Sequence, residues 1–156
     1  MTLKKNIRQK TSLYIFYFLS IIAIAYGLMY LFKNDIMSYH YAFLRMDKTQ
    51  INNFNPHIIK LMLALMKVSG ACFVSVGVTA FIITDRLFKN GEKWALWCLI
   101  SLFSLSLIPM FFVTLNIANN IPAGGIKPPW QFTLAMLILL LVAILLSVIK
   151  RKINNK

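Results

Sequence analysis

Four long apolar runs dominate the chain and are separated by shorter polar segments. They cover about residues 12–32, 57–84, 94–118 and 131–149. Each is close to the ~20 apolar residues that an α-helix needs to cross the hydrocarbon core of a bilayer. The pattern therefore predicts an all-α fold, with residues 1–156 forming one transmembrane domain, a bundle of four transmembrane helices.

The connections between these runs differ in length. The first, from Lys33 to Asn55, is long for a link between helices of one bundle. Its stretch 35–46 contains neither Gly nor Pro, and we expect it to form a short helix in the membrane interface or at the mouth of the bundle. A polar turn over 85–93 and a Pro/Gly-rich loop over 119–129 form the other two connections.

Small residues predict which helices pack most closely. Ser20, Ala23 and Gly27 share one face of the first helix, and Gly70 and Gly77 share one face of the second. Small side chains let two helix backbones approach each other in a membrane. We therefore expect these two faces to pack together.

The third and fourth helices differ in polarity. The third contains Pro109, which is expected to kink it, and carries several polar side chains: Ser101, Ser104, Ser106, Thr114 and Asn116. We expect its hydroxyl groups to join it to the first two helices. The fourth is apolar all round and is expected to face lipid over much of its surface. Any cavity should open outward between the first three helices, with residues 35–46 as its lid.

Composition strengthens the membrane interpretation. The chain is 59% hydrophobic and only 13% charged, against roughly 45–50% and about 25% in soluble domains. The net charge is +13, but the basic residues cluster at the ends of apolar runs. We interpret them as topology signals that contact lipid headgroups, and predict no nucleic-acid partner.

The basic residues are divided unevenly between the two predicted sides. One side carries Lys4, Lys5, Arg8, Lys10, Arg86, Lys89, Lys93, Lys150, Arg151, Lys152 and Lys156. The other side carries Lys33, Arg45, Lys48 and Lys127. Because Lys and Arg are enriched on the cytoplasmic side of membrane proteins, we expect a multi-pass protein of the plasma (inner) membrane with both termini in the cytoplasm.

Lys67 is the first candidate for a functional side chain. It lies within the second helix, on the same face as Lys60, and a charge inside a membrane span is costly and usually has a partner. Of the four acidic residues of the chain, only Asp35 and Asp47 lie on the predicted outer side. Three interpretations are open: Lys67 extends to the headgroups, it pairs with one of these acids, or it binds an anionic ligand.

Further candidates lie near the predicted outer side. His40 and His57 are the only histidines, and without an evident third ligand we predict no metal site. Cys72 and Cys98 lie at different depths of different helices and are expected to be buried, inert thiols. The candidates for ligand binding are Lys67, Lys60, His40, His57, Asp35 and Asn116.

One turn carries a family resemblance. Residues 86–97, with Gly91-Glu92-Lys93-Trp94-Ala95-Leu96-Trp97, resemble the connection between the second and third helices of DoxX-like small bacterial membrane proteins. Overall length and helix count agree with this resemblance. It implies a compact four-helix membrane protein, and transfers no catalytic residue to this chain.

The chemistry-bearing residues favour a non-catalytic function. Acids within the helices, paired thiols and a nucleophile with its base are all missing from the sequence. We predict a small integral membrane protein without a cofactor. It would bind membrane lipids or an apolar ligand, or serve as a subunit of a larger membrane complex or homo-oligomer.

Two other functions are open. The alternative is an enzyme acting on a membrane-soluble substrate, in which His40, His57, Asp35, Asp47 and Lys67 would converge at the outer mouth. This alternative requires those side chains to share a pocket. A pore would need a polar stripe across the whole bilayer, which the fourth helix lacks.

Overall fold

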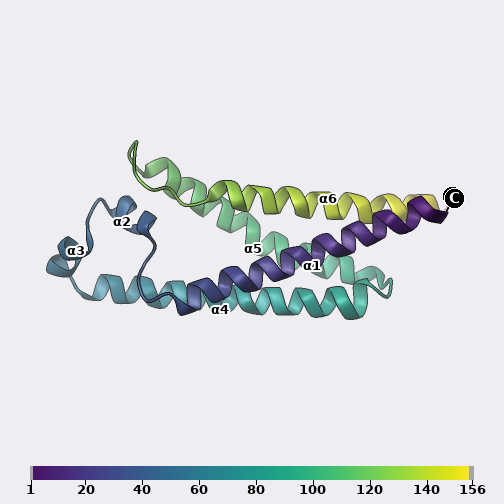
Figure 1. The fold of residues 1–156 in the computed structure, drawn as a ribbon, viewed down its shortest axis with the longest axis horizontal. Coiled ribbons are helices and arrows are strands. Elements are labelled where there is room, and N and C mark those ends of the chain that lie inside the picture. The colour runs from purple at the N-terminus through teal and green to yellow at the C-terminus, as the bar shows by residue number, and fades with distance from the viewer. Residues whose placement is uncertain (1, 155–156) are drawn as a thin grey trace.

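The computed structural model describes residues 2–154, and the side chains of residues 7–148. It confirms the predicted architecture of four long helices, and contains no strand over the described range (Figure 1). The long helices are α1 (Thr2–Phe32), α4 (His57–Ile83), α5 (Lys93–Asn120) and α6 (Trp130–Asn154). All four are long and apolar enough to cross a membrane. The chain is therefore a small multi-pass membrane protein.

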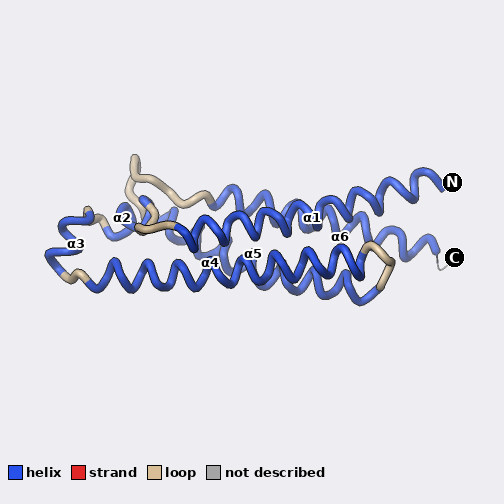
Figure 2. Tube along the Cα trace, turned by 60° about the horizontal axis from the view of Figure 1, so that its bottom comes forward, coloured by secondary structure: helices blue, strands red, loops and turns tan. Residues whose placement is uncertain are grey.

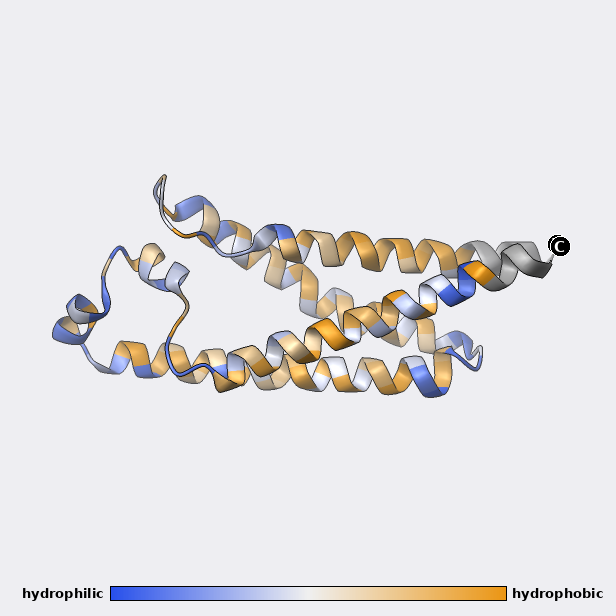
Figure 3. Cartoon of the chain, viewed as in Figure 1, coloured by the Kyte–Doolittle hydropathy of each residue, from blue (hydrophilic) through white to orange (hydrophobic). Residues whose placement is uncertain are grey.

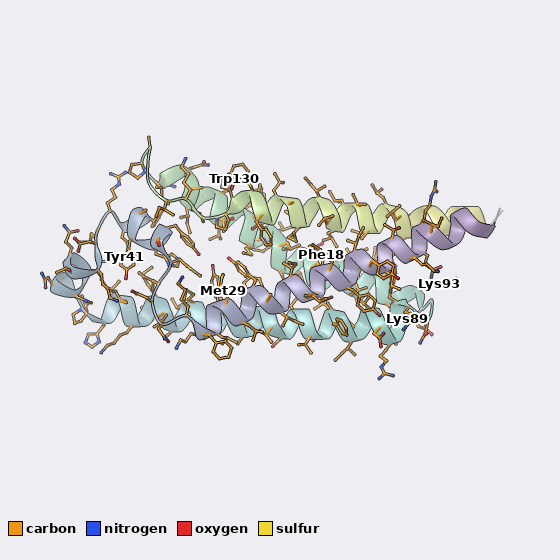
Figure 4. The ribbon with its side chains drawn as sticks, viewed as in Figure 1. Phe18, Met29, Tyr41, Lys89, Lys93 and Trp130 are labelled. Atoms are coloured by element: carbon orange, nitrogen blue, oxygen red, sulfur yellow. The ribbon has the colours of Figure 1, made fainter. Side chains whose placement is uncertain are left out.

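The two ends of the bundle carry different segments. The start of α1, the end of α6 and the tight α4–α5 turn lie at one end, here called the terminal end (Figure 2). The short helices α2 (Ser38–Leu44) and α3 (Lys48–Phe54) lie at the other, here called the loop end. Lys89 and Lys93 mark the terminal end, and Tyr41 and Trp130 mark the loop end (Figure 4). Apolar residues fill the middle of the helices, and polar residues gather at both ends (Figure 3).

The close contact between α1 and α4 confirms the prediction from small residues. A Cβ added to Gly27 would lie 2.6 Å from the carbonyl oxygen of Gly70, and one added to Gly70 would lie 2.8 Å from the carbonyl oxygen of Gly27. A Cβ on Gly77 would lie 2.8 Å from the carbonyl oxygen of Ser20. The two backbones therefore touch at positions that accept only glycine.

α5 joins the bundle through apolar side chains. Leu96, Leu99 and Phe103 are buried, and Phe103 stacks on Phe16 of α1 with ring centroids 6.4 Å apart. The expectation that hydroxyl groups join this helix to α1 and α4 is wrong for Ser106 and Thr114. Their hydroxyls donate to carbonyls of α5 itself, which satisfies them without a second helix.

α6 packs on α1 and α5 along one face only. Met136, Leu140 and Ala143 are buried, while Leu141 and Leu145 are exposed, as expected of an apolar helix that faces lipid. Polar contacts of Ser12 add to this packing, and its hydroxyl oxygen lies 2.7 Å from that of Ser147 in α6. The hydroxyl of Ser12 in α1 donates to the carbonyl of Ala143, 3.0 Å away.

α4 continues further than the predicted polar turn allows. Residues Thr84–Phe88 form a π-helical turn, η1, instead of leaving the helix at Asp85. The Tyr17 hydroxyl donates to the Asp85 carboxylate at 2.8 Å, and Phe88 packs edge-on against Phe16 with centroids 5.1 Å apart. Both contacts join this π turn to α1.

The first connection contains two short helices where one was expected over 35–46. α2 ends at Arg45, which has φ 54, in the left-handed region. Asp47 then caps α3: its carboxylate accepts from the Gln50 amide at 2.8 Å, and the Gln50 side chain accepts from the Asp47 amide at 2.8 Å. This reciprocal capping box starts a new helix, so the segment cannot continue as one.

Candidate functional site

A groove lies between α4 and α5 on the loop-end side of the bundle. The tight turn holds these two helices together at the terminal end, and they diverge toward the loop end, where α5 approaches α6 (Figure 1). The groove has a volume of about 580 Å³, within the roughly 300–1,000 Å³ range of small-molecule sites. Its lining comes from the first three long helices, with Tyr39 and His40 of the 35–46 segment at one end, as expected for this groove. A second pocket also contacts α6, through Phe132, Thr133 and Met136, which was not expected.

Most of the groove surface is apolar. α4 contributes one helical face, at positions three or four residues apart: Met62, Leu65, Ser69, Cys72 and Val76. The facing residues of α5 are Ser106, Pro109, Met110, Val113, Thr114 and Ile117. Unbranched Met side chains occur on both walls, and such side chains adapt to ligands of irregular shape.

A chain of tyrosine hydroxyls forms the polar end of the groove. The Tyr26 and Tyr30 hydroxyls of α1 are 2.8 Å apart, and those of Tyr30 and Tyr39 are 2.7 Å apart. Tyr30, Tyr39 and the neighbouring His40 line the groove. The rings of Tyr39 and His40 pack edge to face, with centroids 4.4 Å apart. Two helices, α1 and α2, therefore bring four polar aromatic side chains together.

His40 has a defined proton arrangement. Its Nδ1 accepts a hydrogen bond from the backbone N–H of Met37, 3.2 Å away. Burial lowers the pKa of His40 below its ordinary value of 6.5, so the neutral ring predominates at pH 7. With Nδ1 as acceptor, the proton of the neutral ring lies on Nε2. His40 therefore offers one N–H donor and no charge.

The aliphatic hydroxyls of the groove have already used their protons. Ser69 donates to Leu65, Ser106 to Leu102 and Thr114 to Met110, each at 2.8–2.9 Å to a carbonyl of its own helix. Their oxygens keep free lone pairs. Within the groove these hydroxyls can therefore accept hydrogen bonds from a ligand but donate none.

Only one of the six predicted ligand-binding residues lines the groove, namely His40. Lys60 and Lys67 are exposed and, at 3.6 residues per turn, lie on the face of α4 opposite the groove. Ion pairing of Lys67 with Asp35 or Asp47 is not observed. Asp35 instead pairs with Lys48, at 2.7 Å, and Asp47 caps α3.

The remaining predicted residues lie apart from one another. His57 is exposed at the start of α4, where its backbone amide donates to Asn55. Asn116 is exposed on α5 and accepts from the side chain of Asn120 at 2.8 Å. Of the residues proposed for the enzyme alternative, Asp35, Asp47, His40, His57 and Lys67, only His40 lines the groove.

Several groove residues were not predicted. Tyr30 lies at the end of an apolar run, where an interfacial tyrosine is expected in any case, so its position carries no specific signal. The spacing of four residues between Tyr26 and Tyr30 does place both side chains on one helical face. This spacing is the sequence signal from which their contact could have been predicted. Cys72 was expected to be buried, but it is exposed and lines the groove.

Comparison of the chain with protein-family models, curated proteins and solved structures gives no match. In the described part of the chain, no three His, Cys, Asp or Glu side chains lie close enough to hold a metal ion. The groove therefore has to be interpreted from its own geometry, as a largely apolar site with neutral hydrogen-bonding groups at one end.

Proposed function

We propose that this protein is a non-catalytic membrane protein that binds a membrane lipid or a similarly apolar ligand in the α4–α5 groove. The observation that carries the proposal is the groove itself, about 580 Å³ between two membrane-spanning helices. It combines apolar walls with neutral polar groups at one end. An amphiphilic molecule has the same two parts, an apolar body and a polar head.

We further propose that both termini lie in the cytoplasm and that the protein resides in the plasma (inner) membrane. The support is the excess of Lys and Arg on the segments that form the terminal end. In this orientation the groove opens toward the outer leaflet. We keep two further predictions from the sequence. The protein is a subunit of a larger complex or homo-oligomer, and it is related to the DoxX-like proteins.

Native mass spectrometry of the protein extracted gently from its own membrane tests the lipid-binding proposal. The decisive pair is Ser69→Phe, which places a ring in the groove, and Ala71→Phe, which adds the same ring on the opposite, exposed face of α4. We expect a lipid adduct in the wild type and in Ala71→Phe, and its loss in Ser69→Phe. An adduct that persists in Ser69→Phe contradicts the proposal.

Lys67→Met tests whether the ligand binds in the groove or at Lys67, the first candidate from the sequence. Since Lys67 is exposed and does not line the groove, this variant should retain the adduct as the wild type does. Loss of the adduct in Lys67→Met, with retention in Ser69→Phe, would instead assign the ligand to the opposite face of α4.

A further inference from the structure

The groove carries no charged side chain. None of its lining residues is Lys, Arg, Asp or Glu, and its one titratable base, His40, is predominantly neutral. A charged group that leaves water without a partner is strongly destabilised. The phosphate of an anionic lipid would therefore find no compensating cation among the residues that line this site.

The hydroxyl chain determines what the polar end can donate and accept. Tyr26, Tyr30 and Tyr39 have three hydroxyl protons, and the two hydrogen bonds between them use two. If the chain is directed toward Tyr26, Tyr39 accepts from a ligand; if it is reversed, Tyr39 donates to the ligand. The polar end can therefore bind either a hydroxyl or a carbonyl group.

His40 supplies a second, fixed donor beside this adaptable one. Among the described residues, none accepts a hydrogen bond from its Nε2–H, and its ring packs on Tyr39. One fixed donor next to a hydroxyl that can donate or accept matches a head with an ester carbonyl and a free hydroxyl. The oxygens of Ser69 and Thr114 offer further acceptors along the apolar walls.

We infer that the ligand of the groove is a neutral membrane lipid with a hydroxyl and ester head, of the diacylglycerol class, and that the groove discriminates against anionic phospholipids. The inference rests on the proposed function and adds the class of ligand to it. In this arrangement the head lies against Tyr39 and His40 of α2, and an acyl chain lies between α4 and α5.

Photolabelling with two matched lipids tests the inference. The full-length protein in phosphatidylcholine nanodiscs receives a diacylglycerol with a diazirine in one acyl chain, or the phosphatidic acid with identical chains. The two probes differ only in the phosphate. We expect labelling of groove peptides from α4 and α5 to be at least about fivefold stronger with diacylglycerol, a ratio equivalent to ~1 kcal/mol.

Variants of α2 show whether the head binds where the geometry indicates. Tyr39→Phe and the double variant Tyr39→Phe, His40→Phe should reduce diacylglycerol labelling severalfold. Tyr41→Phe is the matched control, since it also removes a tyrosine hydroxyl from α2. The Tyr41 hydroxyl donates to Asp35 and lies outside the groove. If the double variant does not give monodisperse protein, Tyr39→Phe alone decides, because it keeps the ring.

The possible outcomes separate the inference from the proposed function. Equal or stronger groove labelling by phosphatidic acid overturns the neutral-lipid inference and leaves lipid binding intact. Labelling by diacylglycerol that Tyr39→Phe does not change also overturns it, because the head is then bound elsewhere. Absence of groove labelling with both probes overturns the inference and the proposed function together.

Discussion

Asp35 connects the end of α1 to both short helices. Its carboxylate accepts from the Lys48 ammonium at 2.7 Å and from the Tyr41 hydroxyl at 2.8 Å. The hydrogen bond to Lys48, together with those to Tyr41 and the Ile36 amide, holds the Asp35 pKa below its ordinary value. Burial and the bond to Asp35 raise the pKa of Tyr41 to about 12. The interaction is therefore formed at neutral pH.

Asp35→Asn should loosen the loop end at pH 7. We expect faster amide hydrogen exchange in α2 and α3, by an amount equivalent to no more than about 1 kcal/mol, because the ion pair is exposed and screened by water. The folded-state pKa of Asp35 is lowered. The stability that the Asp35 carboxylate contributes is therefore fully present above the ordinary Asp pKa of ~3.9. It is lost as the pH falls through the lower pKa of Asp35 in the folded protein.

The wild type should consequently approach the variant as the pH falls below about 4. Hydrogen exchange measured at several pH values and corrected for intrinsic rates checks this. Asp47→Asn is the control, since Asn caps a helix about as well as Asp and should leave α3 unchanged. A difference between wild type and Asp35→Asn that stays constant from pH 7 to pH 3 would show that the carboxylate charge is not the cause.

At the scale of elements, the α1–α4 pair is the most extensive helix contact of the described chain. The carbonyl oxygens of Gly27 and Gly70 occupy the space that a Cβ would need on the opposite helix. In a bilayer the lipid tails are as apolar as the helices, so close van der Waals packing has to hold such a pair together. Because α5 diverges from α4, this pair also keeps one wall of the groove in place.

Gly70→Val should therefore destabilise the bundle by at least about 1–3 kcal/mol, the usual consequence of overpacking. The matched control is Ala71→Val, which adds bulk on the neighbouring, exposed position of the same helix and should change stability little. Reversible unfolding in mixed micelles titrated with sodium dodecyl sulfate measures both free energies. Equal stability of the two variants would contradict the close packing of α1 on α4.

The molecule as a whole is polarised along its long axis. Both termini and the α4–α5 turn share the terminal end, whereas the groove and its polar aromatic groups lie toward the loop end (Figures 1 and 2). The basic residues concentrate in the segments of the terminal end. Under the proposed orientation, the groove faces the leaflet opposite to the one that these basic segments contact.

Fusions to the chain should reveal this orientation. A fluorescent protein attached after Lys156 should be bright, and alkaline phosphatase attached there should be inactive, because phosphatase folds only outside the cytoplasm. Alkaline phosphatase attached after Gly125, in the loop between α5 and α6, should be active. The reverse pattern of phosphatase activity at the two sites would invert the proposed topology and place the groove in the cytoplasmic leaflet.

Local sequence determined the elements that depend on near neighbours. Run length and hydropathy determined the four spans, because the thickness of the bilayer dictates the length of a crossing helix. The Gly27 and Gly70 faces were evident because side chains repeat every 3.6 residues. The start of α3 also has a local signal that went unused in the prediction of one helix over 35–46, namely the capping box of Asp47 and Gln50.

The position of the site depends on how whole helices pack. Periodicity predicts that Lys60 and Lys67 share a face, but which face turns to the groove depends on where α1 packs and where α5 diverges. Tyr39 meets Tyr30 because α2 folds back over the bundle, and Asp35 takes Lys48 as its partner because α3 lies beside it. These contacts arise from the paths of whole helices, and no short window of sequence contains them.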